Sequence, residues 1–123
     1  MFSAERRARK PSLLACLGAL LAAFSIGLSA YASHGVSEAT AQQHLNMAAL
    51  YAFAHGAVLV AMGARTKAVL GQVALSLLLL GVLLFAGSLV GNALWQWSTR
   101  LAPVGGTTLM IGWVLMAVDA LRR

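Results

Sequence analysis

The sequence predicts an all-α, polytopic membrane protein, a single domain that consists of a four-transmembrane-helix bundle. The first observation is that four long stretches contain no Asp, Glu, Lys or Arg, namely 13–33, 45–64, 68–99 and 101–118. At about 1.5 Å of rise per residue, each stretch can cross a hydrocarbon core of about 30 Å as a helix. The second observation is that these stretches occupy most of the 123 residues, which leaves little chain for a soluble domain.

Local signals place the ends of the helices. Pro11 precedes the first helix and Pro103 lies just inside the fourth, where a missing backbone N–H costs least. The third stretch is too long for one span, and its last part, 94–98, carries two tryptophans that predict an anchor at headgroup depth. The segment 37–42 is expected to form a short helical turn on the surface. We therefore expect transmembrane helices over about 13–33, 45–64, 70–94 and 103–121.

The distribution of basic residues predicts the orientation. Only Arg100, of nine basic residues, falls in the loops after the first and third helices. The other eight lie on the opposite side: Arg6, Arg7, Arg9, Lys10, Arg65, Lys67, Arg122 and Arg123. The positive-inside rule assigns that side to the cytoplasm, so an N-in/C-in protein of the bacterial inner (cytoplasmic) membrane is expected. The net charge of +6 then indicates topology and contact with the lipid bilayer, and no nucleic-acid partner is expected.

A cleavable secretory signal is the competing interpretation of the first apolar stretch. Basic residues precede it, and Ser-Ala-Tyr-Ala at 29–32 resembles an A-x-A cleavage site. The apolar run is about 20 residues, whereas the core of a signal peptide has about 7–15. A membrane-spanning helix is therefore favoured.

Small residues in the helices predict close helix packing. Gly87 and Gly91 form a G-x-x-x-G pattern in the third helix, and Thr108 and Gly112 repeat the spacing in the fourth. Small side chains let helix backbones approach each other in lipid. We expect these faces to close the bundle, with a homo-oligomer as the alternative.

The polar residues within the spans predict a polar core. Pairs four residues apart share a helix face, as Tyr51 and His55 do on the second helix. His55 and Trp113 each lie about ten residues, or about 15 Å, from the helix ends opposite the termini, so they should be at similar depth. We expect a core in the outer half of the membrane, open toward the periplasm, made by Tyr51, His55, Ser88, Asn92, Thr108 and Trp113.

Two functions for this core remain open. In the structural interpretation, its groups satisfy one another, with about 0.6 kcal/mol for each contact. In the functional interpretation, His55 handles protons or a small ligand, because an ionisable residue inside a membrane is a functional candidate by default. Asp119, near the cytoplasmic end, is expected to form a structural ion pair or to reach the interface, rather than to act in transport.

Metal, cofactor and redox chemistry are disfavoured. His34, Glu38 and His44 offer two imidazoles and a carboxylate, but their spacing matches no specific metal-binding pattern. A haem with two histidine ligands requires a second histidine at the depth of His55. Cys16 is the single cysteine, which excludes a disulfide within the chain and chemistry that needs a cysteine pair. We expect no catalytic residues, no metal, no cofactor and no enzymatic activity.

Four motifs give the chain a family resemblance. They are A-Y-A-S-H-G at 30–35, Y-A-F-A-H at 51–55, L-F-A-G-S-L at 84–89 and P-V-G-G with a later G-W at 103–113. The chain resembles the YgdD-type small inner-membrane proteins, the domain of unknown function 423, which is related to mitochondrial transmembrane protein 256. Ala52 departs from that pattern, which has Gln there. Besides residues of the expected polar core, the resemblance implies recurring positions at His34, Gly35, Gly87, Pro103, Gly105, Gly106 and Gly112.

The resemblance implies a four-helix integral membrane protein without an established activity. One hypothesis is a non-enzymatic accessory or structural protein, which acts on envelope integrity or within a larger membrane complex. The alternative is a small-ligand or ion-handling protein that uses the polar core around His55.

Overall fold

The computed structural model describes residues 11–122, which form four α-helices. They are α2 (Leu13–His34), α3 (Ala39–Met62), α4 (Val69–Trp95) and α5 (Leu101–Arg122). All four are long and apolar enough to cross a membrane, and the described residues contain no strand. The predicted all-α fold with four membrane spans is therefore confirmed.

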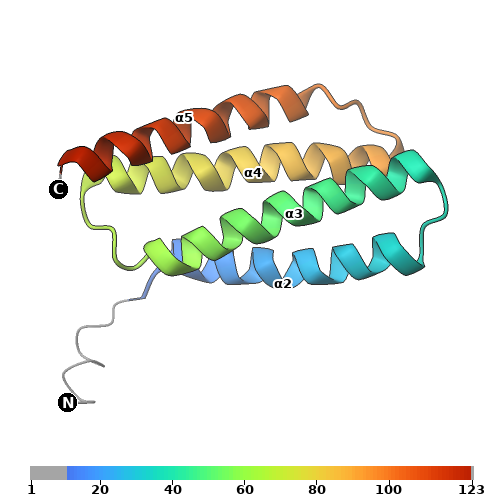
Figure 1. The fold of residues 1–123 in the computed structure, drawn as a ribbon, viewed down its shortest axis with the longest axis horizontal. Helices are drawn as coiled ribbons and strands as arrows, with labels where there is room; N and C mark the ends of the chain where they lie inside the picture. Colours follow the sequence, from blue (N-terminus) through green and yellow to red (C-terminus); the bar gives the residue numbers. More distant parts are fainter. Residues whose placement is uncertain (1–10, 123) are drawn as a thin grey trace, which may run out of the picture.

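The helices lie side by side in chain order (Figure 1). The pairs α2–α3 and α4–α5 pack most extensively, and α3 against α4 joins the two hairpins. Within the described chain, no Cα atom of α5 lies within 8 Å of a Cα atom of α2 or α3. The helices α3 and α4 are thus interior, and α2 and α5 form the two edges.

The two ends of the molecule differ in charge. The start of α2, the end of α5 and the α3–α4 loop lie at one end, which we call the terminal end (Figure 1). The α2–α3 and α4–α5 loops lie at the other, which we call the Trp95 end. Arg65, Lys67 and Arg122 belong to the terminal end, and Arg100 belongs to the Trp95 end. The other basic residues of the sequence lie outside the described residues: Arg6, Arg7, Arg9, Lys10 and Arg123.

Side-chain caps fix where the first two helices begin. The Ser12 hydroxyl accepts a hydrogen bond from the Ala15 N–H at 3.2 Å, at the start of α2. The Glu38 carboxylate accepts from the Thr40 N–H at 3.1 Å and the Ala41 N–H at 2.6 Å. These two bonds lower the pKa of Glu38, and the bond from Ala41 has the larger effect. Because of this cap, α3 begins at Ala39 rather than near residue 45, and the expected surface turn is its first turn.

The end of α4 folds the chain back over the helix. Gln96 has a left-handed backbone (φ 59°), and its N–H donates to the Asn92 carbonyl at 3.0 Å. The Trp97 N–H donates to the Gly91 carbonyl at 3.2 Å, which completes a C-terminal capping motif. The rings of Trp95 and Trp97 stack with centroids 5.0 Å apart.

Glycines bring the backbones of each hairpin together. A Cβ atom on Gly18 of α2 would lie 2.6 Å from the Gly56 carbonyl oxygen of α3, and the reverse distance is also 2.6 Å. Gly81 of α4 faces Gly105 of α5 in the same way, and a Cβ on Gly81 would lie 3.0 Å from the Gly105 carbonyl oxygen. Such approaches are the use that membrane helices make of small residues.

The expected packing face around Gly87 differs from the structure. Gly87 is exposed, and a Cβ there would meet nothing within 4 Å. Gly91 is buried, but beneath the Trp97 indole rather than against another helix. A G-x-x-x-G pattern fixes which residues share a face, and it does not say which face meets a neighbouring helix.

Candidate functional site

The centre of the candidate site is a hydrogen-bonded bridge between α3 and α5. The Trp113 Nε1–H donates to His55 Nε2 at 3.1 Å. Because an indole nitrogen only donates, His55 Nε2 is the unprotonated nitrogen of a neutral ring. His55 Nδ1–H therefore donates to the Tyr51 carbonyl oxygen, 2.8 Å away. Both ring nitrogens of His55 are thus bonded within the chain.

Aromatic rings surround this bridge. The Tyr51 ring stacks with the His55 ring at a centroid distance of 6.0 Å, and it also contacts Phe85 of α4 at 4.7 Å. The rings of His55 and Trp113 meet edge to face at 5.8 Å. His55 is 6% exposed and Trp113 is 44% exposed, so the imidazole is enclosed while the indole faces outward.

The bridge lies near the middle of the membrane-spanning helices. Trp113 is about 18 Å along α5 from Leu101, in a helix of 22 residues that is about 33 Å long. His55 is about 24 Å from Ala39, because α3 begins earlier than expected. The predicted similar depth of His55 and Trp113 agrees with their contact, and both lie farther from the starts of α3 and α5 than the expected distance of about 15 Å.

Asn92 belongs to a second polar site, at the Trp95 end. His44 Nδ1 lies 3.0 Å from Asn92 Oδ1, and an amide oxygen only accepts, so His44 is the donor. The Asn92 amide N–H donates to the Trp97 carbonyl at 2.7 Å. Asn92 therefore joins α3, α4 and the turn after α4. His44 is not among the residues that the sequence predicts for the polar core, because the predicted second helix begins after it.

The remaining two polar residues of the expected core lie apart from the bridge. The Thr108 hydroxyl donates to the Val104 carbonyl of its own helix at 2.8 Å. The Ser88 hydroxyl is buried and has no hydrogen-bond partner among the described residues. The structure therefore brings together Tyr51, His55 and Trp113, and it distributes Asn92, Thr108 and Ser88 over separate positions.

The positions implied by the family resemblance mostly shape the backbone. His34 ends α2, and Gly35 caps it with an N–H bond to the Tyr31 carbonyl at 2.7 Å. Pro103 lies in the first turn of α5. The buried glycines of α5 face α4: a Cβ on Gly105 would meet the Phe85 backbone, and one on Gly112 would lie 2.9 Å from a Leu78 methyl carbon. Gly106 and Gly87 lie outside these tight contacts.

A cavity of about 670 Å³ adjoins the bridge. We call it the α3–α5 groove. Phe85 of α4 and Leu109 of α5 contribute to its wall, and Tyr51 and His55 line it from α3. The other lining residues come from one side of α5: Ala102, Pro103, Gly106, Thr107, Met110 and Trp113.

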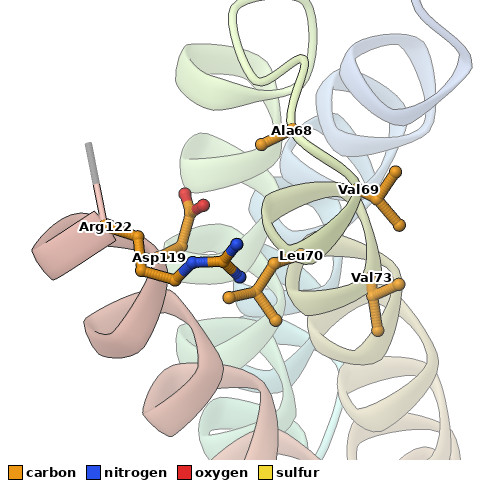
Figure 2. Close-up of a pocket in the computed structure, with 6 residues that line it drawn as sticks. All are labelled: Ala68, Val69, Leu70, Val73, Asp119 and Arg122. Atoms are coloured by element: carbon orange, nitrogen blue, oxygen red, sulfur yellow. The ribbon is translucent and has the colours of Figure 1, made fainter.

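A second cavity, of about 590 Å³, lies at the terminal end. Figure 2 shows Asp119 and Arg122 of α5 beside the first residues of α4. Asp119 is 7% exposed, and Gly71 leaves room for it, since a Cβ there would lie 3.0 Å from Asp119 Oδ2. The Asp119 carboxylate thus occupies space between α4 and α5, close to the basic end of the molecule.

The histidines and acids do not gather into a metal site. Between residues 11 and 122, no group of three or more His, Cys, Asp or Glu side chains is placed to hold a metal ion. His34, Glu38 and His44 are therefore not assembled as two imidazoles and a carboxylate. His44 is bonded to Asn92, and Glu38 caps α3.

Comparison with known proteins places this chain among membrane proteins. Residues 28–106 match the family model described as "Protein of unknown function (DUF423)". A UPF0382 membrane protein of Haemophilus influenzae is 33% identical over 116 residues, covering 86% of this chain and 91% of its own length. A UPF0382 membrane protein of Staphylococcus epidermidis is 30% identical over 113 residues, covering 86% and 93%. No solved structure matches.

Proposed function

Because the chain belongs to the DUF423 family of proteins of unknown function, we propose that it is a non-enzymatic accessory or structural protein of the bacterial inner membrane. In this role it acts through helix contacts, on envelope integrity or within a larger membrane complex. In this proposal the protein is oriented N-in/C-in, with the basic terminal end in the cytoplasm.

The bonding of His55 is the observation that carries this proposal. An ionisable group inside a membrane is the first candidate for proton or ligand chemistry. Both nitrogens of this imidazole are already engaged, by Trp113 and by the Tyr51 carbonyl. The group thus connects α3 to α5, a pair whose backbones do not approach. A structural role for His55 therefore accounts for both hydrogen bonds of its ring.

The edges of the molecule offer surface for a partner. In an apolar stretch of 18 residues, 17% of the residues are buried in α2 and in α5, against 39% in α3 and 44% in α4. The exposed side of α2 includes Gly27, where an added Cβ would meet nothing within 4 Å. Among residues 11–122 this glycine has no close neighbour outside its own helix, so it is available for contact with another helix.

Native mass spectrometry of the full chain, extracted from its own membranes in mild detergent, tests the proposal. We expect the protein to be released together with a larger assembly at fixed stoichiometry. Gly27→Leu should weaken that association without lowering the melting temperature, and Gly87→Leu is the matched exposed control on α4. A protein released alone from every preparation would contradict the accessory role.

A second candidate, small-ligand or ion handling, is favoured by the α3–α5 groove beside His55. A small molecule that stays bound in the same measurement, with no protein partner, would favour this candidate over the accessory role.

A further inference from the structure

The α3–α5 groove runs along the helix axis from one membrane surface to the middle. Its lining residues on α5 extend from Ala102, next to the Trp95 end, to Trp113. That stretch is about 16 Å long at about 1.5 Å per residue. Half of a hydrocarbon core of about 30 Å is about 15 Å, so the groove matches the depth of one leaflet. The His55–Trp113 bridge closes its inner end.

The wall of the groove is mainly hydrocarbon and aromatic. Phe85, Leu109 and Met110 present apolar side chains, and Gly106 adds no side chain to the groove. The Thr107 hydroxyl donates to the Pro103 carbonyl at 2.8 Å, so its proton is used within its own helix. The two nitrogen-bearing rings at the inner end already bond to each other. Such a surface suits an unbranched methylene chain better than a polar ring.

The position of the groove decides where its occupant comes from. It lies between α3 and α5, whose backbones stay apart, at a depth where a bilayer contains no water. Its occupant must therefore be apolar and must enter from the lipid. Arg100 lies two residues before Ala102, and within the described chain it is the basic residue of the Trp95 end. A guanidinium at headgroup level attracts an anionic phosphate.

We propose that the α3–α5 groove binds one acyl chain of an anionic phospholipid, with the phosphate near Arg100 and the end of the chain at the His55–Trp113 bridge. This inference names the ligand class for the second candidate function, and it does not depend on the accessory role. A lipid in this groove would fill the gap between α3 and α5 that the bridge alone spans.

The test is native mass spectrometry of the purified full chain in detergent, with phosphatidylglycerol as the added probe. A Cβ on Gly106 would have Phe85 as its nearest neighbour, at 4.0 Å, so Gly106→Leu fills the groove without a backbone clash. Gly27→Leu is the matched control, since it adds the same side chain to the exposed face of α2. We expect one retained phospholipid on the wild type and on Gly27→Leu, and at least a tenfold weaker adduct on Gly106→Leu. Ala102→Leu, at the mouth of the groove, should act in the same direction if Gly106→Leu fails to fold.

Further results distinguish an anionic phospholipid from other occupants of the groove. Arg100→Gln should reduce the preference for phosphatidylglycerol over phosphatidylcholine, because it removes the charge and leaves the groove intact. Equal lipid retention by wild type, Gly106→Leu and Ala102→Leu would overturn the proposal, and so would a retained mass that belongs to a quinone rather than a phospholipid. Loss of a protein partner in Gly27→Leu, with lipid retained, would concern the accessory role alone.

Discussion

His55 lies where an unbonded polar group is costly, because the bilayer interior supplies no water to replace a missing partner. Its two hydrogen bonds meet that requirement from opposite sides of the ring, one within α3 and one from α5. Sequence reasoning identified both His55 and Trp113 and expected similar depths. It could not supply the distance of His55 from the start of α3, because that depends on the cap by Glu38, which extends α3 toward the Trp95 end.

Replacement of His55 should separate the loss of a bond from the loss of the fold. His55→Leu leaves the Trp113 N–H without its acceptor, and we expect a loss of about 1–3 kcal/mol in unfolding free energy. His55→Gln, which keeps an amide acceptor, should lose less. In a double-mutant cycle with Trp113→Phe, measured by unfolding in detergent, the coupling should be about 1–2 kcal/mol, because the cost of the unbonded indole N–H is absent from the Phe variant. Strict additivity of the two changes would mean that the bridge contributes nothing.

The cap of α3 should make stability depend on acid pH. The pKa of Glu38 is lowered in the folded protein by the N–H groups of Ala41 and Thr40. Its contribution is therefore fully present above the unfolded carboxyl pKa of about 4.3, and it is lost as the pH falls through the lower folded value. Melting temperatures of wild type and Glu38→Gln between pH 3 and pH 7 should differ most at pH 7 and converge in acid. A constant difference across that range would contradict the cap.

At the scale of helices, close backbone contact holds each hairpin together. Gly18 and Gly56 serve α2 and α3, and Gly81 and Gly105 serve α4 and α5. The sequence predicted the four spans well because hydropathy and length are local properties. It did not predict which glycines pack, because helices that are apolar on all sides carry no signal for the face that points inward. Gly87 is an example. It belongs to a G-x-x-x-G pattern that predicts close helix packing, but it lies on an exposed face of α4.

Alanine substitutions should therefore sort the glycines of the α4–α5 hairpin. Gly105→Ala places a methyl group against the Phe85 backbone, and we expect a loss of about 1–3 kcal/mol from overpacking. Gly87→Ala meets open space and should stabilise the helix by about 0.5–1 kcal/mol. Thermal unfolding in one detergent compares the two directly. A Gly105→Ala protein as stable as Gly87→Ala would show that α4 and α5 do not pack in this register.

At the scale of the whole molecule, four antiparallel helices put the start of α2 and the end of α5 at the same end of the molecule (Figure 1). The order of the helices leaves α2 and α5 at the edges, an arrangement that hydropathy alone does not distinguish from a closed bundle. In this arrangement, two hydrogen bonds between polar side chains of different helices lie at different positions along the helices. Asn92 meets His44 at the Trp95 end, while His55 meets Trp113 farther along the helices.

The orientation is open to cysteine labelling in a Cys16→Ala background. Ser37→Cys, in the α2–α3 loop, should react with a membrane-impermeant maleimide added to intact cells, because the positive-inside rule places that loop outside. Thr66→Cys, in the α3–α4 loop, is the matched probe for the cytoplasmic side, and it should react only after permeabilisation. The reverse pattern would invert the proposed topology.

The structural role of His55 is tested most directly by ¹⁵N NMR of histidine-labelled protein in lipid nanodiscs at neutral pH, with His55→Gln used to assign the signal. The bridge requires a neutral ring with the proton on Nδ1 and an unprotonated Nε2 that accepts from Trp113. We therefore expect one protonated and one unprotonated nitrogen signal, and a shift of the Trp113 indole proton in the His55→Gln protein. An imidazolium, or a neutral ring with the proton on Nε2, would contradict the bridge and return His55 to the candidates for proton or ligand chemistry.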